Sequence, residues 1–170
     1  MDIAIIQWIT DVLQSPVLTS VMRFITSLGN MGIIWFLFAG YFFYVRKDRK
    51  TAACLVAAVV LTWFCNDLVL KNMFNRPRPF MTHAQFPALI TPPTSSSFPS
   101  GHSATSFAAM AVLAASGGKW KLSGILIAVM IAFSRIYLHV HYPTDVLTGC
   151  LIGVLIGSFL VRQMRKQKVQ

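Results

Sequence analysis

Three polar segments, far apart in the chain, interrupt apolar sequence and carry residue types that handle anions. They read Lys71-Asn-Met-Phe-Asn-Arg-Pro-Arg78-Pro79, Pro99-Ser-Gly-His102, and Ser134-Arg135 followed by His141 and Asp145. Polar side chains at membrane depth are costly and tend to mark function. We therefore expect the three segments to meet at one level and form a single site.

The combination of three cations, two histidines and one carboxylate suits a phosphate group. Lys71, Arg78 and Arg135 would neutralise its oxygens, because Arg presents forked donors and Lys a point charge. Ser100 and Gly101 open a predicted helix, whose free N–H groups and dipole attract anions. Glycine also lets the backbone approach a ligand closely.

The same residue types indicate how the chemistry would proceed. Phosphoryl transfer needs positioning and charge stabilisation above all. The sequence holds no cluster of carboxylates, which disfavours a two-metal mechanism, and we expect no metal and no other cofactor. Histidine must then serve as nucleophile and as proton donor.

The pattern Lys-x6-Arg-Pro, Pro-Ser-Gly-His and Ser-Arg-x5-His-x3-Asp resembles the signature of the type 2 phosphatidic acid phosphatase superfamily. This superfamily includes lipid phosphate phosphatases, bacterial phosphatidylglycerophosphate phosphatases and undecaprenyl-diphosphate phosphatases; soluble vanadium haloperoxidases share the constellation. Every signature position is matched between residues 71 and 145. Three motifs in this order are far more specific than any one of them alone.

The resemblance implies a role for each signature residue. His141 would attack phosphorus to form a phosphohistidine, and Asp145 would accept the proton on its other ring nitrogen. His102 would protonate the leaving oxygen and then activate water. The residues that would hold the phosphoryl oxygens are Lys71, Arg78, Ser100, Gly101 and Arg135. The family works without a metal, and vanadate would bind as a transition-state-like anion.

The expected substrate is a lipid phosphomonoester or diphosphate: undecaprenyl diphosphate, phosphatidylglycerophosphate or phosphatidic acid. The motifs indicate the phosphate group and do not specify the lipid tail. Two alternatives share the scaffold, namely a phosphotransferase that passes the phosphoryl group to another lipid, and a non-catalytic lipid-binding or transport protein. The second is disfavoured because His102 and His141 are both present.

The composition indicates that these segments lie in a lipid environment. The chain has 170 residues, of which 55% are hydrophobic and only 12% charged, whereas a soluble domain carries about 25% charged residues. The formal net charge is +10. Ten of the 15 basic residues lie in three clusters: Arg46, Lys47, Arg49 and Lys50; Lys119 and Lys121; Arg162, Arg165, Lys166 and Lys168. Such clusters flank membrane spans, so we expect a bilayer as partner and no nucleic acid.

The pattern predicts one all-α domain, an integral membrane helical bundle of five spans. The spans are expected near 28–45, 51–70, 103–117, 122–138 and 145–161. Residues 1–27, capped at Ser15 and interrupted at Pro16, are expected to form two helices in the membrane interface. Residues 162–170 would be a basic cytoplasmic tail. Many members of the superfamily begin with an additional span, so the N-terminal segment departs from the pattern.

The basic clusters also predict the orientation. If they are cytoplasmic, the N-terminus and residues 71–101 and 139–143 face the opposite side. The active site would then open on the extracellular or periplasmic side of the cell membrane.

Several nearby residues allow more than one interpretation. Asp67, one helical turn before Lys71, is expected to orient it. Arg76 would contact a lipid headgroup, solvent or substrate, and His139 would be structural or lie at the substrate's edge. A stripe formed by Gly149, Gly153 and Gly157 favours close packing inside the bundle, with a homodimer through the fifth helix as the alternative.

Paired histidine roles generate a first prediction. Activity should depend on pH in a bell shape, because His141 must be deprotonated to attack while His102 must hold a proton. Phosphate release measured from about pH 5 to about pH 9 would show this, and a flat profile would contradict the paired roles.

Overall fold

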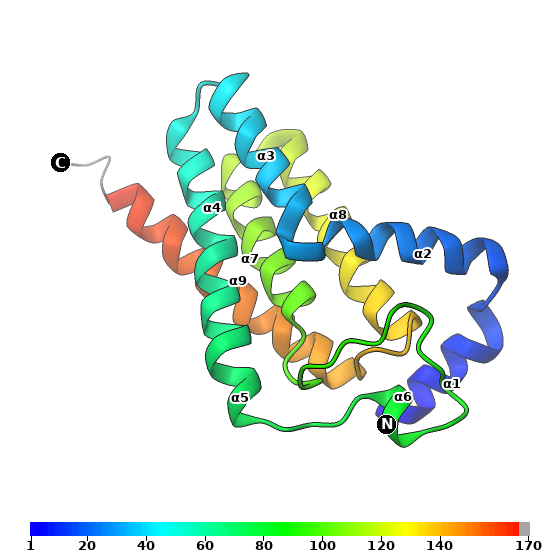
Figure 1. Ribbon diagram of the computed structural model, residues 1–170. Helices are drawn as coiled ribbons and strands as arrows, with labels where there is room; N and C mark the ends of the chain where they lie inside the picture. Colours follow the sequence, from blue (N-terminus) through cyan, green and yellow to red (C-terminus); the bar gives the residue numbers. More distant parts are fainter. Residues whose placement is uncertain (167–170) are drawn as a thin grey trace.

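The computed structural model describes residues 1–166, and within this range every regular element is helical (Figure 1). The main helices are α1 (Asp2–Leu13), α2 (Pro16–Leu28), α3 (Ile33–Tyr44), α4 (Arg49–Trp63), α7 (Gly101–Ser116), α8 (Gly118–Tyr137) and α9 (Pro143–Lys166). Shorter pieces are a 3₁₀ turn (Asn30–Gly32), a π-helical segment (Phe64–Leu70), α5 (Lys71–Met73) and α6 (Pro79–Thr82). The chain is thus an all-helical bundle, as predicted.

Three helices in the described part of the chain are long and apolar enough to cross a membrane. They are the continuous helix Arg49–Met73, α8 and α9, and the bent pair of α2 and α3 is a fourth candidate. The helix at the predicted third span, α7, has 16 residues, fewer than the roughly 20 of a straight crossing. The architecture is that of a multi-pass membrane protein.

Two predicted segments take a different form. Residues 28–45 do not make one helix: α2 and α3 meet at a bend of 51°. The turn between them holds Met31 at φ 50° and Gly32 at φ 73°, left-handed backbone that no α-helix continues through. Residues 162–166 extend α9, and Lys168 lies outside the described residues.

Helix α7 lies at the centre of the bundle, packed against α4, α8 and α9 (Figure 1). The glycine stripe of α9 faces it so closely that a Cβ on Gly149 would lie 2.5 Å from the Ser100 carbonyl oxygen. A Cβ on Gly153 would lie 2.9 Å from the Ala108 nitrogen. The stripe is therefore filled by α7 within the chain, and a homodimer through α9 would need its other face.

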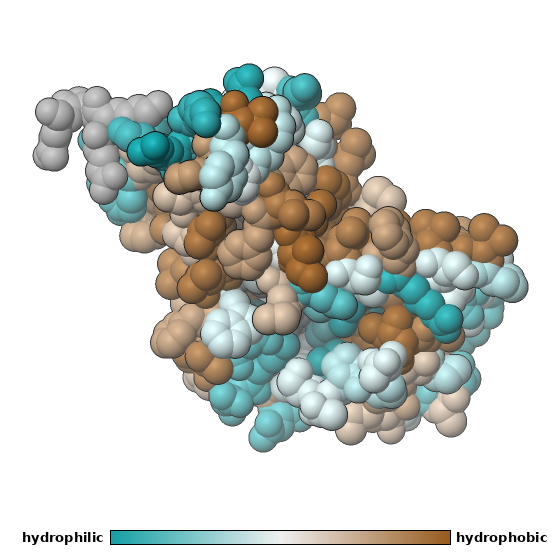
Figure 2. All heavy atoms as spheres, turned by 45° about the horizontal axis from the view of Figure 1, so that its top comes forward, coloured by the Kyte–Doolittle hydropathy of each residue, from teal (hydrophilic) through white to brown (hydrophobic). Residues whose placement is uncertain are grey.

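That other face of α9 is apolar and exposed. Leu147, Leu151, Leu155 and Phe159 recur at one-turn spacing and are each more than half exposed. Figure 2 shows the same character more widely, with hydrophobic side chains along the middle of the bundle and hydrophilic ones both near the C-terminus and at the opposite end. Such a surface suits contact with lipid.

The first two helices are hydrogen-bonded to the end of α8 and to the loop that follows it. The hydroxyl groups of Tyr137 and Thr19 are 3.0 Å apart. The Nε2 atom of His139 lies 3.0 Å from both the Thr10 hydroxyl and the Gln14 amide nitrogen. His139 is 1% exposed, so of its two predicted roles the structural one is observed.

The glycine stripe of α9 generates a second prediction. Gly153→Ala should lower the free energy of unfolding by about 1–3 kcal/mol, because the new methyl group overlaps the α7 backbone. Gly40→Ala is the matched control, since nothing lies within 4 Å of a Cβ there and the change removes only a flexible helical glycine. Thermal unfolding in detergent measures both. Equal melting temperatures for the two variants would contradict the packing.

Candidate active site

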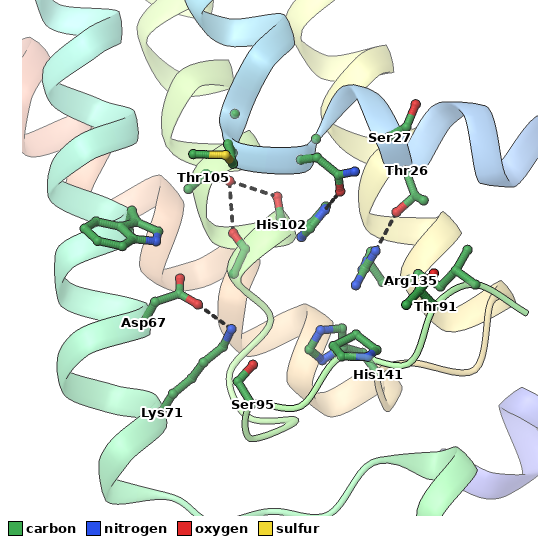
Figure 3. Close-up of a pocket in the computed structure, with 18 of the residues that line it drawn as sticks. Thr26, Ser27, Asp67, Lys71, Thr91, Ser95, His102, Thr105, Arg135 and His141 are labelled. Carbon is green, nitrogen blue, oxygen red and sulfur yellow. Dashed lines mark hydrogen bonds and ion pairs between the residues drawn. The ribbon is translucent and has the colours of Figure 1, made fainter. Parts of the chain in front are cut away.

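A cavity of about 860 Å³ opens beside the start of α7. Six of the eight predicted site residues line it: Lys71, Arg78, Gly101, His102, Arg135 and His141. They come from α5, the segment before α6, α7, α8 and the loop between α8 and α9. Figure 3 shows Lys71, His102, Arg135 and His141 directed at the same space. The three polar segments therefore meet around one cavity.

The contacts of His141 define its tautomer. Its Nε2 lies 3.2 Å from Arg78 Nη1. A guanidinium has only donors, so Nε2 accepts and the proton of the neutral ring is on Nδ1. Burial lowers the pKa of His141 below its usual range, and the charges of Arg135 and Arg78 act in the same direction. At neutral pH the ring is therefore uncharged, with a lone pair on Nε2.

Asp145 lies behind His141 and is fully buried. Its Oδ2 is 3.6 Å from His141 Nδ1, close enough for electrostatic attraction but longer than a hydrogen bond. The same oxygen accepts hydrogen bonds from the Ser97 hydroxyl at 2.6 Å and the Tyr142 N–H at 2.9 Å. The carboxylate is thus held next to the ring by donors other than His141.

Arg76 supplies the charge that balances Asp145. Its side chain is 33% exposed, so the expected contact with a lipid headgroup, solvent or substrate stays a prediction. Its Nη1 donates to Asp145 Oδ1 at 2.5 Å, and its Nη2 donates to Asp2 Oδ2 at 3.0 Å. The guanidinium also stacks 4.2 Å from the Tyr142 ring centroid. A buried carboxylate needs a counter-charge, and Arg76 is the cation in contact with it.

Arg78 is anchored by the loop that closes the cavity. Its guanidinium donates to the carbonyl oxygens of Ser95 at 2.9 Å and Val140 at 2.6 Å. Burial lowers the pKa of Arg78 to about 10, which leaves it charged at neutral pH. It therefore presents a fixed positive charge beside His141.

The other two cations are held from opposite walls. Lys71 forms an ion pair with Asp67, in agreement with the predicted orienting role of that acid. Arg135 donates from Nη1 to the Thr26 hydroxyl at 2.6 Å, while its Nε, buried like the rest of the side chain, has no hydrogen-bond partner within residues 1–166. A buried donor without a partner is unusual and suits a site for an anion.

Ser100 is buried and lies outside the cavity lining. Its Oγ is 2.9 Å from Ser103 Oγ and caps α7 by accepting from the Ser103 N–H. Gly101, one position on, does line the cavity, and a Cβ there would be 2.9 Å from Asp67 Oδ2. Of the two residues, Gly101 is therefore the one that faces the cavity, and the Ser100 hydroxyl caps the helix start.

The N-terminal segment contributes residues to the cavity, which the sequence did not predict. Thr26 and Asn30 line the cavity, and Asn30 Oδ1 lies 2.9 Å from His102 Nε2. The available signal was the Gly29-Asn-Met-Gly32 run, whose composition indicates a turn inside an apolar stretch. Within residues 1–166, no group of three or more His, Cys, Asp and Glu side chains is arranged to hold a metal ion.

An apolar helical bundle with a cavity lined by cations and two histidines defines a membrane protein built to hold a phosphate-like anion. Comparison with known families gives the same answer, since the model of the PAP2 superfamily matches residues 51–168. The chain belongs to the PAP2 superfamily.

Individual relatives support this assignment. The chain is 31% identical to an undecaprenyl-diphosphatase of Sulfolobus acidocaldarius, over 89% of this chain and 72% of that protein. It is 35% identical to phosphatidylglycerophosphatase B of Bacillus subtilis, over 88% and 76% of the two chains. The crystal structure of Aquifex aeolicus LpxE superposes with a TM-score of 0.79 at 28% identity, covering 95% of this chain and 94% of that one. Like the first two relatives, which are named as phosphatases, the chain is a phosphatase-type enzyme.

The contact between Arg76 and Asp145 generates a third prediction. Arg76→Ala should lower the free energy of unfolding by about 2 kcal/mol, because it leaves a buried carboxylate without its counter-charge. Arg76→Lys should lose less. Melting temperature in detergent measures the effect, with the exposed Arg46 changed to Ala as a control. If Arg76→Ala were as stable as the control, the carboxylate would not depend on this partner.

Proposed function

We propose that the protein is a membrane lipid phosphatase that hydrolyses a lipid phosphomonoester or diphosphate through a phosphohistidine. One observation carries the proposal: Arg78 donates to His141 Nε2 in the wall of a cavity shared with His102 and Arg135. That contact identifies Nε2 as the unprotonated nitrogen of His141, beside several positive charges. Arg78 would transfer this hydrogen bond to a phosphoryl oxygen as the freed lone pair attacks phosphorus.

The reaction would run in two steps. His141 Nε2 bonds to phosphorus as the bond from phosphorus to the leaving oxygen breaks, and His102 gives that oxygen a proton. A water molecule then attacks the phosphohistidine while His102 takes back a proton, and phosphate leaves as the P–N bond breaks. Asp145 stabilises the positive charge that develops on the ring of His141.

The cations divide the remaining work. Arg78, Arg135 and Lys71 would balance the charge on the phosphoryl oxygens, and the Gly101 N–H would add a donor at the start of α7. Lys71 would exchange its contact with Asp67 for one with the phosphate. These charges replace the metal ions used in other phosphatases, so the proposed reaction needs none.

The proposed arrangement in the membrane follows the five-span topology, with α7 as a short span and the α1–α2 hairpin at the interface. Figure 1 supports it, because the turn between α3 and α4 lies at one end of the bundle and the loop after α8 at the other. The basic turn would be cytoplasmic. The cavity would then receive lipid phosphates from the extracellular or periplasmic leaflet of the cell membrane.

The choice of lipid follows from the relatives. Those named undecaprenyl-diphosphatase and phosphatidylglycerophosphatase make undecaprenyl diphosphate and phosphatidylglycerophosphate the first substrates to compare, with phosphatidic acid as the third. The ratio of kcat/KM values for the three in one detergent identifies the preferred substrate. Labelled phosphate appearing on an acceptor lipid instead of in solution would support transfer.

Removal of the nucleophile is the fourth prediction. His141→Ala should lower kcat at least about 10³-fold, since no other side chain replaces a lost nucleophile. His83→Ala is the matched control, because His83 lies outside the cavity lining. Phosphate release from a lipid substrate is measured with and without a chelator of divalent metals. Full activity of His141→Ala, or loss of activity with the chelator, would contradict the mechanism.

A further inference from the structure

The bend between α2 and α3, which we call the elbow (residues 26–32), touches two cavity side chains. We propose that Asn30 is a positioning residue for His102: by binding Nε2 it holds the ring in the orientation in which the protonated ring donates to the leaving group from Nδ1. The inference rests on the proposed function, because His102 acts there as the proton donor. The elbow lies before residue 51, where the match to the PAP2 superfamily begins.

The contact itself specifies where the proton is. Asn30 Oδ1 lies 2.9 Å from His102 Nε2, and an amide oxygen only accepts hydrogen bonds. With the oxygen facing the ring, Nε2 carries the proton of neutral His102. Asn30, which also lines the cavity, therefore holds the Nε2 proton, and the proton that His102 gives to the leaving group is the one on Nδ1 of the protonated ring.

The backbone of the elbow is shaped to make this contact. A Cβ on Gly29 would lie 2.8 Å from His102 Cδ2, so any other residue would push the ring away. Gly32, at φ 73°, is pressed against Val59 of α4, where a Cβ would lie 2.8 Å from Cγ1. Left-handed backbone of this kind favours glycine. The elbow is thus wedged between α4 and α7 with little freedom to move.

A second contact shows that the elbow serves the cavity and not packing alone. The Thr26 hydroxyl accepts a hydrogen bond from Arg135 Nη1 at 2.6 Å. One short segment therefore orients the proposed proton donor from α7 and a proposed phosphate ligand from α8. Such partners fix the geometry of catalytic side chains, and their loss reduces rate more than binding.

The leaving group separates positioning of the acid from a general structural role. An alkoxide, the product of a lipid phosphomonoester, departs slowly unless protonated, whereas p-nitrophenolate departs without a proton. General acid catalysis contributes about 10²–10⁴-fold where it is needed. A defect that acts through His102 must therefore appear with the lipid and vanish with p-nitrophenyl phosphate.

The fifth prediction compares a lipid phosphate with an aryl phosphate as substrates of the Asn30→Ala variant. Asn30→Ala should lower kcat/KM for phosphatidic acid about 10- to 100-fold and change kcat/KM for p-nitrophenyl phosphate less than about 3-fold. Retained hydrolysis of the aryl phosphate also shows that the variant folds. Asn30→Asp keeps the accepting oxygen and should recover most of the activity on the lipid.

Two companion variants complete the experiment. Asn72→Ala is the matched control, since Asn72 is an exposed asparagine whose side chain donates to the Leu68 carbonyl of its own helix, and it should leave both rates unchanged. His102→Ala should show the same selectivity for the lipid as Asn30→Ala, with a larger loss.

The outcomes distinguish the two proposals. If His102→Ala is selective and Asn30→Ala reduces both substrates equally or neither, the role of Asn30 is overturned and the proposed function stands. If His102→Ala reduces both substrates equally, His102 is not the proton donor, and the inference falls with it. Failure of Asn30→Asp to recover activity would likewise overturn the placement of the proton on Nε2.

Discussion

The near-contact of α7 with α9 sets the geometry on which the site depends. Glycines at 149, 153 and 157 bring the two helix backbones together, and the Ser100 N–H donates to the Asp145 carbonyl oxygen at 3.1 Å where the helices begin. His102 starts one helix and His141 precedes the other. A bulkier residue at any of these glycines would widen the space between the two imidazoles. Small residues deep in the bundle therefore determine the geometry of the active site.

The second constraint is electrostatic. Arg78, Arg135 and Asp145 are almost completely buried, in surroundings where an unpaired charge is expensive. Asp145 is compensated by Arg76 and two further donors, and Arg78 by loop carbonyl oxygens. Among the residues that the structure describes, the Arg135 guanidinium has the Thr26 hydroxyl as its hydrogen-bond partner. The unbalanced positive charge is located where an anion would bind, so the energy needed to bury it is recovered on binding.

Residue spacing in the sequence predicted the all-helical bundle, and six of the eight predicted site residues line the cavity, because motifs at helix ends carry both the chemistry and the register. It could not predict contacts that depend on how separate helices meet. Arg76 looked like a surface residue because nothing in its local sequence reveals Asp2 and Asp145 as partners. The first span is predicted to begin at residue 28, whereas α3 begins at Ile33 after the turn Asn30–Gly32, so the contact of Asn30 with His102 was missed.

The docking of the first hairpin has a consequence for biogenesis. Thr19 is 118 residues from its partner Tyr137, and Thr10 is 129 residues from His139. A ribosome releases the amino-terminal helices long before those partners exist. The amino-terminal hairpin can therefore take its final position only after α8 has been made, so this part of the fold is completed late in synthesis.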